Sequence, residues 1–260
     1  MPVSGLLLDL DGVLYIGSTL IPGARETLAW LHQHGIPVRF ITNTTTQTPM
    51  QLVRKLHGFG IDAREDEVFS AVSATVAYLR QQGKPRCHLL VADAVKPCFA
   101  EFPVDTQRPD YVVIGDIGNA WNYTLLNDAF MMLMRGARLL CLHRNKYWQT
   151  EDGLCMDIGA FVTALEYASG TVARVIGKPA LTYFDMAVNS LAVPAAEVAI
   201  VGDDIDSDIG GGQAAGLQGM LVQTGKYRTE LAARSQVTPE YLLPSIAELP
   251  ALLTQIRAGI

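Results

Sequence analysis

Two carboxylates lie close together near the start of the chain, where the stretch GLLLDLDGVLY places Asp9 and Asp11 on either side of Leu10. The leucines before them predict a buried strand, and residues two apart on a strand point to the same side. Carboxylates at such a separation repel each other unless a proton or a cation lies between them. The spacing therefore indicates a cation site at the end of this strand.

Further polar groups follow two other apolar runs, VRFIT and EVAIVG. Thr42 and Asn43 end the first run, Asp203 and Asp204 follow the second, and Lys178 opens the helical pattern that precedes the second. Ligands of open parallel sheets bind outside the carboxyl ends of the strands. We therefore expect these groups to meet at one edge of a sheet.

Together these residue types are suited to phosphoryl transfer. Several carboxylates supply the hard oxygen ligands that Mg²⁺ prefers, and a carboxylate can attack phosphorus to form an acyl phosphate, which divides hydrolysis into two steps. The transferred group carries negative charge on its equatorial oxygens, so it needs hydroxyl, amide and ammonium donors around it. Thr42, Asn43 and Lys178 offer those donors.

The elements that must position these residues alternate along the chain. Apolar runs predict strands at GLLLDL, VRFITN, CHLLVA, YVVIG, RLLCLH, EVAIVG and GMLVQ. Helical spacing predicts helices near residues 22–35, 48–59, 71–83, 125–134, 158–168 and 181–191, after Asp208 and from Ser245. Uniformly apolar strands that alternate with helices are typical of parallel sheets covered on both faces. We therefore expect an α/β fold with a Rossmann-like parallel-sheet core.

The middle of the chain has its own alternation and its own charge balance. Residues 79–177 carry ten basic and ten acidic side chains, whereas the remainder carries ten basic and sixteen acidic ones. One parallel sheet rarely serves 260 residues, so we expect a core in two parts, 1–78 and 178–260, and an inserted α/β cap domain at 79–177. Six of the sixteen acids outside the middle segment are Asp9, Asp11, Asp203, Asp204, Asp206 and Asp208.

Composition and charge argue against several other classes of protein. The formal net charge of −6 and the sequence pI of about 5.3 disfavour nucleic acid or an anionic membrane as a partner. No apolar run approaches the roughly 20 residues that span a bilayer, the start MPVSGLLLDL has no basic segment of a signal peptide, and the four cysteines form no CxxC pair. We therefore expect a cytoplasmic protein with no nucleic-acid or membrane partner.

Four stretches, DLDGVLY, ITNTT, GKP and VGDDIDSD, resemble in order the four motifs of the haloacid dehalogenase-like (HAD) phosphatases, and the resemblance covers the whole chain. It implies that Asp9 is the nucleophile. It also implies that Asp11 is a general acid/base that gives a backbone carbonyl to Mg²⁺, and that Asp203 ligates the metal. Asp208, which fits the spacing of the last motif, would support the metal shell, and Asp204 could share that work.

The same resemblance assigns the phosphate-binding groups. Thr42 and Lys178 would bind the phosphoryl group, and Asn43 would line the same loop. Residues 12–21 would form the flap that follows the first strand in this family. Asp206 matches no family position and is expected to be a solvated surface residue.

The insertion between the second and third motifs resembles the α/β cap of subclass IIA, which includes NagD-type nucleotide phosphatases and phosphoglycolate phosphatase. The stretches VVIGDIGNAWNYTLLNDAFMMLM, KYWQTEDGLCMDIGAFVTALEYASG and VGDDIDSDIGGGQAAG are similar to the phospholysine phosphohistidine inorganic pyrophosphate phosphatase group. In this subclass the loop after the central cap strand reaches over the active site, which makes Arg144, Asn145 and Lys146 candidates for substrate contact. Related caps often pair two subunits, so the resemblance implies a homodimer through the cap.

Alternative functions remain to be weighed against this one. A receiver-type phospho-acceptor domain also gathers acids, a hydroxyl, a lysine and Mg²⁺, but its acceptor Asp lies on a later strand than the acidic pair. The chain is also about twice as long as such a domain needs. A non-catalytic binder of the same fold would not need the complete set of acids. A phosphomutase of the same fold stays open, because the same intermediate can be passed to a sugar instead of water.

The sequence therefore predicts a Mg²⁺-dependent phosphatase that hydrolyses a small phosphorylated metabolite through an aspartyl-phosphate intermediate. Asp9 attacks, Mg²⁺ and Lys178 neutralise the developing charge, and Asp11 protonates the leaving group and then activates water. Phosphoamino acids, pyrophosphate, nucleotides and sugar phosphates all stay open as substrates, because cap loops vary while the core chemistry does not.

Overall fold

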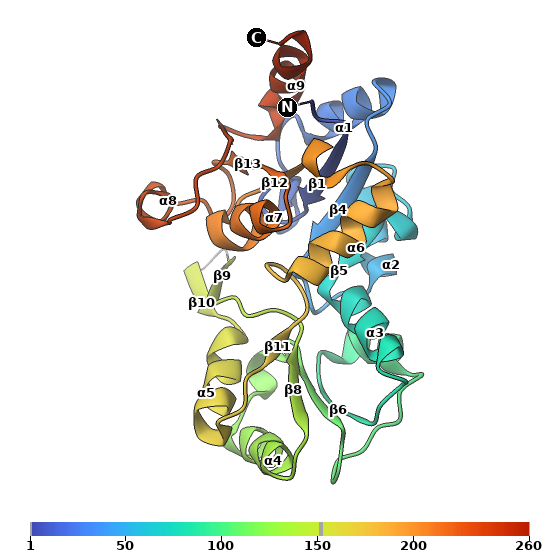
Figure 1. The fold of residues 1–260 in the computed structure, drawn as a ribbon, viewed down its shortest axis with the longest axis vertical. Coiled ribbons are helices and arrows are strands. Elements are labelled where there is room, and N and C mark those ends of the chain that lie inside the picture. The colour runs from blue at the N-terminus through green and yellow to red at the C-terminus, as the bar shows by residue number, and fades with distance from the viewer. Residues whose placement is uncertain (1, 151–152, 260) are drawn as a thin grey trace. The chain divides into compact units, whose positions relative to one another are not determined.

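The computed structural model describes residues 2–150 and 153–259, which form two compact units (Figure 1). The first unit comprises Met1–Thr42, Leu52–Phe69 and Lys178–Ile260, and the second comprises Asn43–Gln51 and Ser70–Gly177. The chain first passes into the second unit after Thr42 and finally returns to the first unit at Lys178. Both residues are candidates for phosphate binding. The domain ranges 1–78, 79–177 and 178–260 stay a prediction about which segments fold as independent units.

The first unit is built on a six-stranded sheet with the order β14-β13-β12-β1-β4-β5. Its strands are β1 (Gly5–Asp9), β4 (Val38–Thr42), β5 (Val68–Ser70), β12 (Val198–Gly202), β13 (Gln218–Val222) and β14 (Tyr241–Leu243). The strand β1 pairs in parallel with both β12 and β4. Asp9 at the end of β1, Thr42 at the end of β4 and Asp203 after β12 are therefore brought to one edge of the sheet.

The burial of β1 explains why this edge is fixed. All five residues of β1 are buried, and Leu8 lies opposite Val201 on one side and Phe40 on the other. Leu6 and Leu8 belong to one apolar cluster, which also contains residues of the helices α1 (Ala24–Gln33), α2 (Pro49–Gly58) and α9 (Leu249–Ala258). The helix α6 (Leu181–Leu191) contacts β1 and β4 as well as α7 (Gly211–Ala214). A central strand surrounded in this way leaves its polar end residue little freedom to move.

Two smaller elements of the first unit lie close in sequence to the candidate residues. The strands β2 (Tyr15–Ile16) and β3 (Thr19–Leu20) form an antiparallel hairpin, which occupies the segment predicted to form a flap. The helix α8 (Thr229–Arg234) follows the loop that leaves β13.

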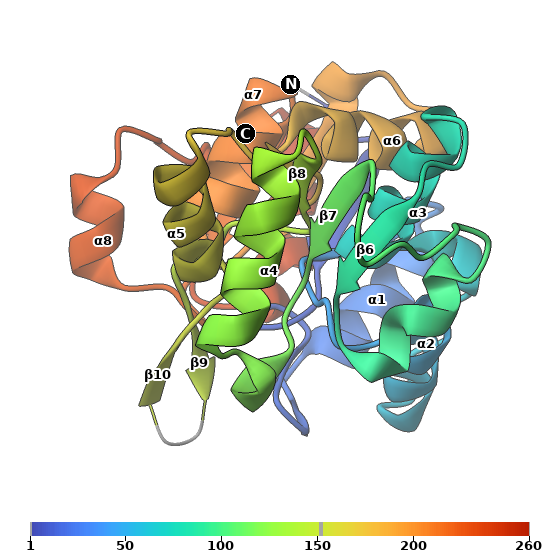
Figure 2. The same cartoon turned by 90° about the horizontal axis from the view of Figure 1, so that it is seen from below.

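The second unit contains a parallel sheet of its own, with the order β11-β8-β7-β6. These strands are β6 (Cys87–Leu90), β7 (Tyr111–Ile114), β8 (Arg138–Cys141) and β11 (Arg174–Val175). The helices α4 (Tyr123–Met134) and α5 (Gly159–Ser169) lie side by side against it (Figure 2) and bury apolar side chains in one cluster with the strands. The unit is completed by the helix α3 (Ala71–Gln81) and by the antiparallel strands β9 (Tyr147–Thr150) and β10 (Gly153–Met156).

The predicted α/β class and the long elements are confirmed. The helix α6 has the predicted bounds, and the predicted runs contain β1, β4, β6, β7, β8 and β12. The predicted run GMLVQ covers all of β13 except its first residue, Gln218. The last helical segment begins at Ser245 as predicted, because the Ser245 hydroxyl accepts the Ala247 N–H and caps a helical turn, Ile246–Glu248, that leads directly into α9. The strands β5, β11 and β14 were not predicted, because two or three residues are too few to establish a periodicity.

No helix in the described part of the chain is both long enough and apolar enough to cross a membrane.

Replacing Leu8 by Ala should lower the free energy of unfolding by about 2–5 kcal/mol, because the side chain is fully buried between two paired strands and its removal leaves a cavity. Leu231→Ala on α8 is the matched control, since Leu231 is 43% exposed and should lose less than about 1 kcal/mol. Urea unfolding followed by circular dichroism measures both. Equal losses in the two variants would mean that β1 is not the buried centre of the first unit.

Candidate active site

Three buried carboxylates converge at the carboxyl edge of the first sheet. Asp9, Asp203 and Asp208 each offer a carboxylate oxygen, and these oxygens all lie within 4.8 Å of one another. Asp9 ends β1, whereas Asp203 and Asp208 belong to the loop and the short helix that follow β12. The parallel pairing of β1 with β12 brings together residues that are almost two hundred positions apart in sequence.

Lys178 provides the positive charge that holds this group together. Its Nζ lies 2.7 Å from Asp9 Oδ1 and 2.7 Å from Asp208 Oδ1, and all three side chains are buried. Burial by itself would lower the pKa of Lys178, but the carboxylates of Asp208 and Asp9 outweigh it and raise that pKa above its ordinary value. The lysine is therefore a fixed cation that connects the first strand to the loop after β12.

Asp208 shapes this loop from within. Its Oδ2 accepts the backbone N–H groups of Asp203 at 3.2 Å and Asp204 at 3.1 Å. Gly202 leaves the room for this, because a Cβ at that position would collide with the Asp208 carboxylate. Burial raises the pKa of Asp208 to about 6, although Lys178 acts in the opposite direction. The sequence-based assignment made Asp208 a support for the metal shell, and the structure places its carboxylate inside the acidic trio itself.

Asp203 has one oxygen bound and one without a partner. Its Oδ2 accepts the backbone N–H of Lys226 at 2.6 Å, whereas its Oδ1 is buried and has no hydrogen-bond partner. Burial and the neighbouring Asp9 and Asp208 raise the pKa of Asp203 well above its ordinary range. A buried carboxylate oxygen without a donor, next to two further carboxylates, fits a hard divalent cation such as Mg²⁺.

Glycines make the close approach to Asp203 possible. Gly12 and Gly225 have φ angles of +88° and +61°, and a Cβ at either position would overlap with Asp203 Oδ2. The Thr224 hydroxyl donates a hydrogen bond to the Gly12 carbonyl at 2.5 Å, which ties the loop after β13 to the loop after β1. Backbone atoms of two loops therefore enclose the Asp203 carboxylate, and the Thr224 side chain links these loops.

Asp11 lies beside the trio but outside it. The residue is exposed, and its backbone bridges to Tyr15 at the start of the hairpin. The surrounding protein nevertheless removes enough water from the carboxyl group to raise the pKa of Asp11, while Lys55, and more weakly Lys226 and Lys178, oppose that shift. The exposed position suits a group that exchanges protons with a ligand or with water.

Thr42 is held in place by a residue that the sequence did not reveal. The Thr42 N–H donates to the hydroxyl of buried Tyr183 at 3.0 Å, and that hydroxyl oxygen lies 3.1 Å from the Thr42 carbonyl and 2.5 Å from the Phe69 carbonyl. Burial raises the pKa of Tyr183, so the phenol keeps its proton and can donate to one of these carbonyls. Tyr183 thereby connects α6 to the ends of β4 and β5.

The remaining sequence-predicted residues have other surroundings. Asp204 caps the short helix Ile205–Gly210, where its Oδ1 accepts the N–H groups of Asp206 at 3.1 Å and Ser207 at 3.0 Å. Asp204 therefore acts on the loop backbone and does not belong to the trio.

Four predicted substrate or phosphate contacts belong to the second unit. Asn43 Nδ2 lies 3.5 Å from Asn145 Oδ1, so the structure brings these two side chains together. Arg144 pairs with Glu166 at 2.6 Å, which ties its guanidinium to α5. Lys146 is exposed, and its backbone carbonyl accepts the Asp157 N–H at 3.1 Å. Their assignment to substrate stays a prediction.

Three residues close to the site were missed by the sequence reasoning. Besides Tyr183, they are Lys226, whose pKa is raised chiefly by Asp203 against the effect of burial, and Lys55, whose Nζ lies 3.8 Å from the centroid of the Tyr15 ring. Lys55 lies within an amphipathic helix pattern and Lys226 follows a turn glycine, so neither belongs to a recognisable motif. A weak signal was available only in Gly225-Lys226, a second GK pair after an apolar strand.

Comparisons by sequence and by structure find the same kind of known protein. Residues 6–104 match the family model described as haloacid dehalogenase-like hydrolase, and residues 175–249 match a second model of HAD-hydrolase-like proteins. The chain is 41% identical over 226 residues to haloacid dehalogenase-like hydrolase domain-containing protein 2 of Bos taurus, covering 87% of this chain and 86% of that protein. It is 37% identical over 259 residues to the human phospholysine phosphohistidine inorganic pyrophosphate phosphatase, covering 97% and 95%.

Solved structures show the same similarity. The 4-nitrophenylphosphatase of Thermotoga maritima superposes with a TM-score of 0.89 at 28% identity, covering 96% of this chain and 97% of that one. NagD from E. coli K-12 superposes with a TM-score of 0.84 at 26% identity, covering 95% and 98%.

Gly12→Ala should lower the free energy of unfolding by about 1–3 kcal/mol more than Gly17→Ala. Both glycines have positive φ and share the strain of an L-residue there, but only at Gly12 would the added Cβ collide with Asp203, since nothing lies within 4 Å at Gly17. Chemical unfolding of the two variants measures the difference. Equal stabilities would show that the Gly12 backbone does not approach Asp203 as described.

Proposed function

We propose that this chain, which belongs to the haloacid dehalogenase-like hydrolases and is a phosphatase, hydrolyses a small phosphorylated metabolite through an aspartyl-phosphate at Asp9, with Mg²⁺ as cofactor. The observation that carries the proposal is the buried trio of Asp9, Asp203 and Asp208 with Lys178 in contact with two of them. If the trio served stability alone, its buried polar atoms should all be hydrogen-bonded, but Asp203 Oδ1 is buried and has no hydrogen-bond partner.

Asp9 is the nucleophile in this proposal. Lys178 contacts its Oδ1 and fixes the carboxylate at the end of a fully buried strand. One Asp9 oxygen forms a bond to phosphorus while the bond from phosphorus to the leaving oxygen or nitrogen of the substrate breaks, which gives an acyl phosphate on the enzyme. Lys178 remains beside this centre and balances the negative charge on the equatorial oxygens.

The donor set for a metal comes from the same residues. Asp9, Asp203 and the backbone carbonyl of Asp11 would hold Mg²⁺, with Asp208 orienting the loop that carries Asp203. Bound Mg²⁺ would neutralise charge on the acids and on the phosphoryl oxygens. The backbone N–H of Lys226 donates a hydrogen bond to Asp203 Oδ2, which leaves Asp203 Oδ1 available to the metal.

Asp11 is the general acid and base. Asp11 follows Asp9 by two residues, and the pKa of its carboxyl group is raised chiefly by burial, so it can carry a proton to the leaving oxygen or nitrogen. The resulting carboxylate then accepts a proton from the water that attacks the acyl phosphate, which releases phosphate and restores both residues. Thr42, which Tyr183 holds by its backbone, is the proposed hydroxyl donor to the phosphoryl group.

The substrate class is proposed from the similarity to named relatives. The human relative that covers 97% of this chain is named for phospholysine, phosphohistidine and inorganic pyrophosphate. Compounds with P–N or P–O–P bonds are therefore the first class to test, before nucleotides and sugar phosphates.

Asp9→Asn should reduce phosphate release by at least about a thousandfold with the fold intact, because an amide cannot form the acyl phosphate. Asp206→Asn is the control, since this exposed acid belongs to the same acidic loop but not to the trio. Steady-state phosphate release from a panel of P–N, P–O–P and monoester substrates, with circular dichroism as the fold check, measures both variants. Retained Mg²⁺-dependent turnover in Asp9→Asn would contradict the assignment of the nucleophile.

Removal of divalent cations should abolish phosphate release, and added Mg²⁺ should restore it, because the acids repel one another and the substrate without a cation. Asp203→Asn should weaken Mg²⁺ binding by at least about tenfold, measured by isothermal titration calorimetry independently of turnover. Unchanged activity after exhaustive chelation with EDTA would exclude the metal from the reaction.

A further inference from the structure

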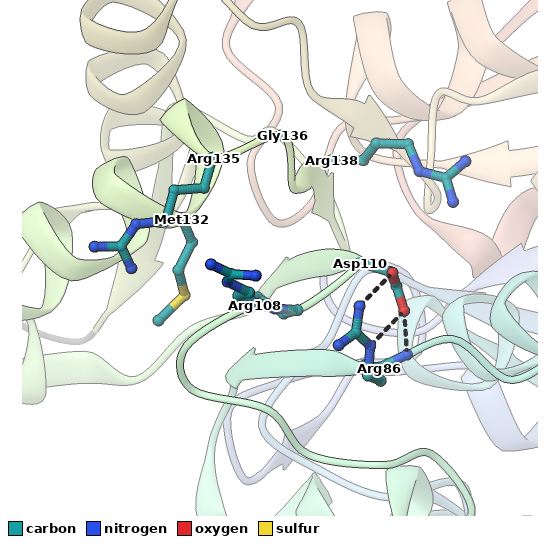
Figure 3. Close-up of a pocket in the computed structure, with 8 residues that line it drawn as sticks. Arg86, Arg108, Asp110, Met132, Arg135, Gly136 and Arg138 are labelled. Atoms are coloured by element: carbon teal, nitrogen blue, oxygen red, sulfur yellow. Dashed lines mark hydrogen bonds and ion pairs between the residues drawn. The ribbon is translucent and has the colours of Figure 1, made fainter.

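A pocket lies in the second unit, at the edge where the strands of its sheet begin. It has a volume of about 550 Å³ and is lined by Arg86, Arg108, Asp110, Met132, Arg135 and Arg138, together with two small residues (Figure 3). Arg86 and Asp110 directly precede β6 and β7, and Arg138 begins β8. Met132 belongs to the last turn of α4, and Arg135 directly follows that helix. All of these residues lie within one compact unit.

The lining carries four guanidinium groups and one carboxylate. Arg86 contacts Asp110 through Nε at 3.2 Å and through Nη2 at 3.1 Å, and it contacts Asp105 through Nη1 at 3.3 Å. Arg86, Arg108, Arg135 and Arg138 carry four positive charges against the two negative charges of Asp105 and Asp110. The pocket therefore has an excess of positive charge in a chain whose net charge is −6.

None of the three other arginines forms an ion pair with a carboxylate among the described residues, although Arg86 and, more weakly, the charge of Arg138 lower the pKa of Asp110. The Arg138 guanidinium lies over the Tyr111 ring at 4.0 Å, which fixes its plane and leaves its N–H groups at the edge. Arg135 donates to the Gln107 carbonyl at 3.5 Å, and Arg108 is an exposed residue on the loop before β7. Guanidinium forks that line one pocket and form no ion pair with an acid match the bidentate geometry of phosphate oxygens.

We propose that this pocket binds an elongated anion that carries two or more phosphate groups. Figure 3 shows the guanidinium groups spread along the pocket, with Arg108 between Met132 and the Arg86–Asp110 pair and with Arg135 and Arg138 on either side of Gly136. A single orthophosphate could reach few of these spread groups, whereas a chain of phosphates could contact several. The volume is also within the range of small-ligand sites.

This site differs from the proposed catalytic centre in its chemistry. The catalytic trio is acidic and suits a cation, whereas this pocket is basic and needs no metal to attract phosphate. Binding here therefore does not depend on the proposed function, and it can be measured when the metal is chelated.

A competing explanation is that the arginines only complement local backbone dipoles. Arg135 follows the last residue of α4, and a cation at a helix carboxyl end is stabilising by itself. The chain offers a matched control in Arg257, which is exposed in the last turn of α9 and lies outside the pocket. If Arg135 only complements the helix dipole, replacing Arg135 and replacing Arg257 should have the same effect on anion binding. If the pocket is a binding site, only the replacement of Arg135 should weaken anion binding.

The experiment titrates inorganic triphosphate into the full-length protein in EDTA at low salt and follows the heat of binding. The double variant Arg108→Gln/Arg135→Gln should weaken binding by at least about tenfold, because two charge-assisted contacts are lost. Arg257→Gln should change the affinity by less than about twofold. Orthophosphate should bind the unmodified protein at least about tenfold more weakly than triphosphate.

Three outcomes would overturn the proposal: no triphosphate binding by the unmodified protein, unchanged binding in the double variant, or an equal loss in Arg257→Gln. Thermal unfolding and circular dichroism establish that the variants are folded. The single variant Arg108→Gln, which removes an exposed side chain without a carboxylate partner, provides the same comparison with the least change to the protein.

Discussion

The contact of Lys178 with Asp9 and Asp208 is the interaction on which the rest of the first unit depends. All three charges are buried, and a buried carboxylate without compensation costs far more than the fold could offset. Lys178 contacts Asp9 and Asp208 at 2.7 Å each but carries only one positive charge. Asp203, which interacts with Lys226, adds a third carboxylate. The excess of acid over base at this edge is what makes a divalent cation fit, and it is the physical reason for placing phosphoryl chemistry here.

The sheet supplies the precision that this interaction needs. A fully buried central strand ends in Asp9, its parallel neighbour leads directly into Asp203, and glycines on two loops allow backbone atoms to approach the Asp203 carboxylate. The Tyr183 hydroxyl also fixes the position of Thr42, because it accepts the backbone N–H of that residue. Functional groups are thus carried by strand ends and tight loops, whose positions depend on packing and not on side-chain mobility.

The two units distribute charge in different ways. The first concentrates carboxylates around one lysine, and the second places arginines around a pocket at the start of its strands. The relatives share the architecture of the whole chain, but their names cover several phosphorylated compounds. This diversity is what one expects when a constant core performs the chemistry and the surfaces of an inserted unit differ.

The sequence by itself determined the α/β class and the long strands and helices, and it identified Asp9, Asp11, Asp203 and Lys178 as candidates for the site, because apolar runs and polar strand ends are local signals. It could not determine that Asp208 lies inside the acidic trio while Asp204 caps a helix, since residues four apart in one acidic loop look alike until the loop folds. Tyr183, Lys55, Lys226 and the arginine pocket were also beyond its reach. Each of these depends on contacts between segments distant in sequence, and only the packing of sheets and helices decides which distant side chains meet.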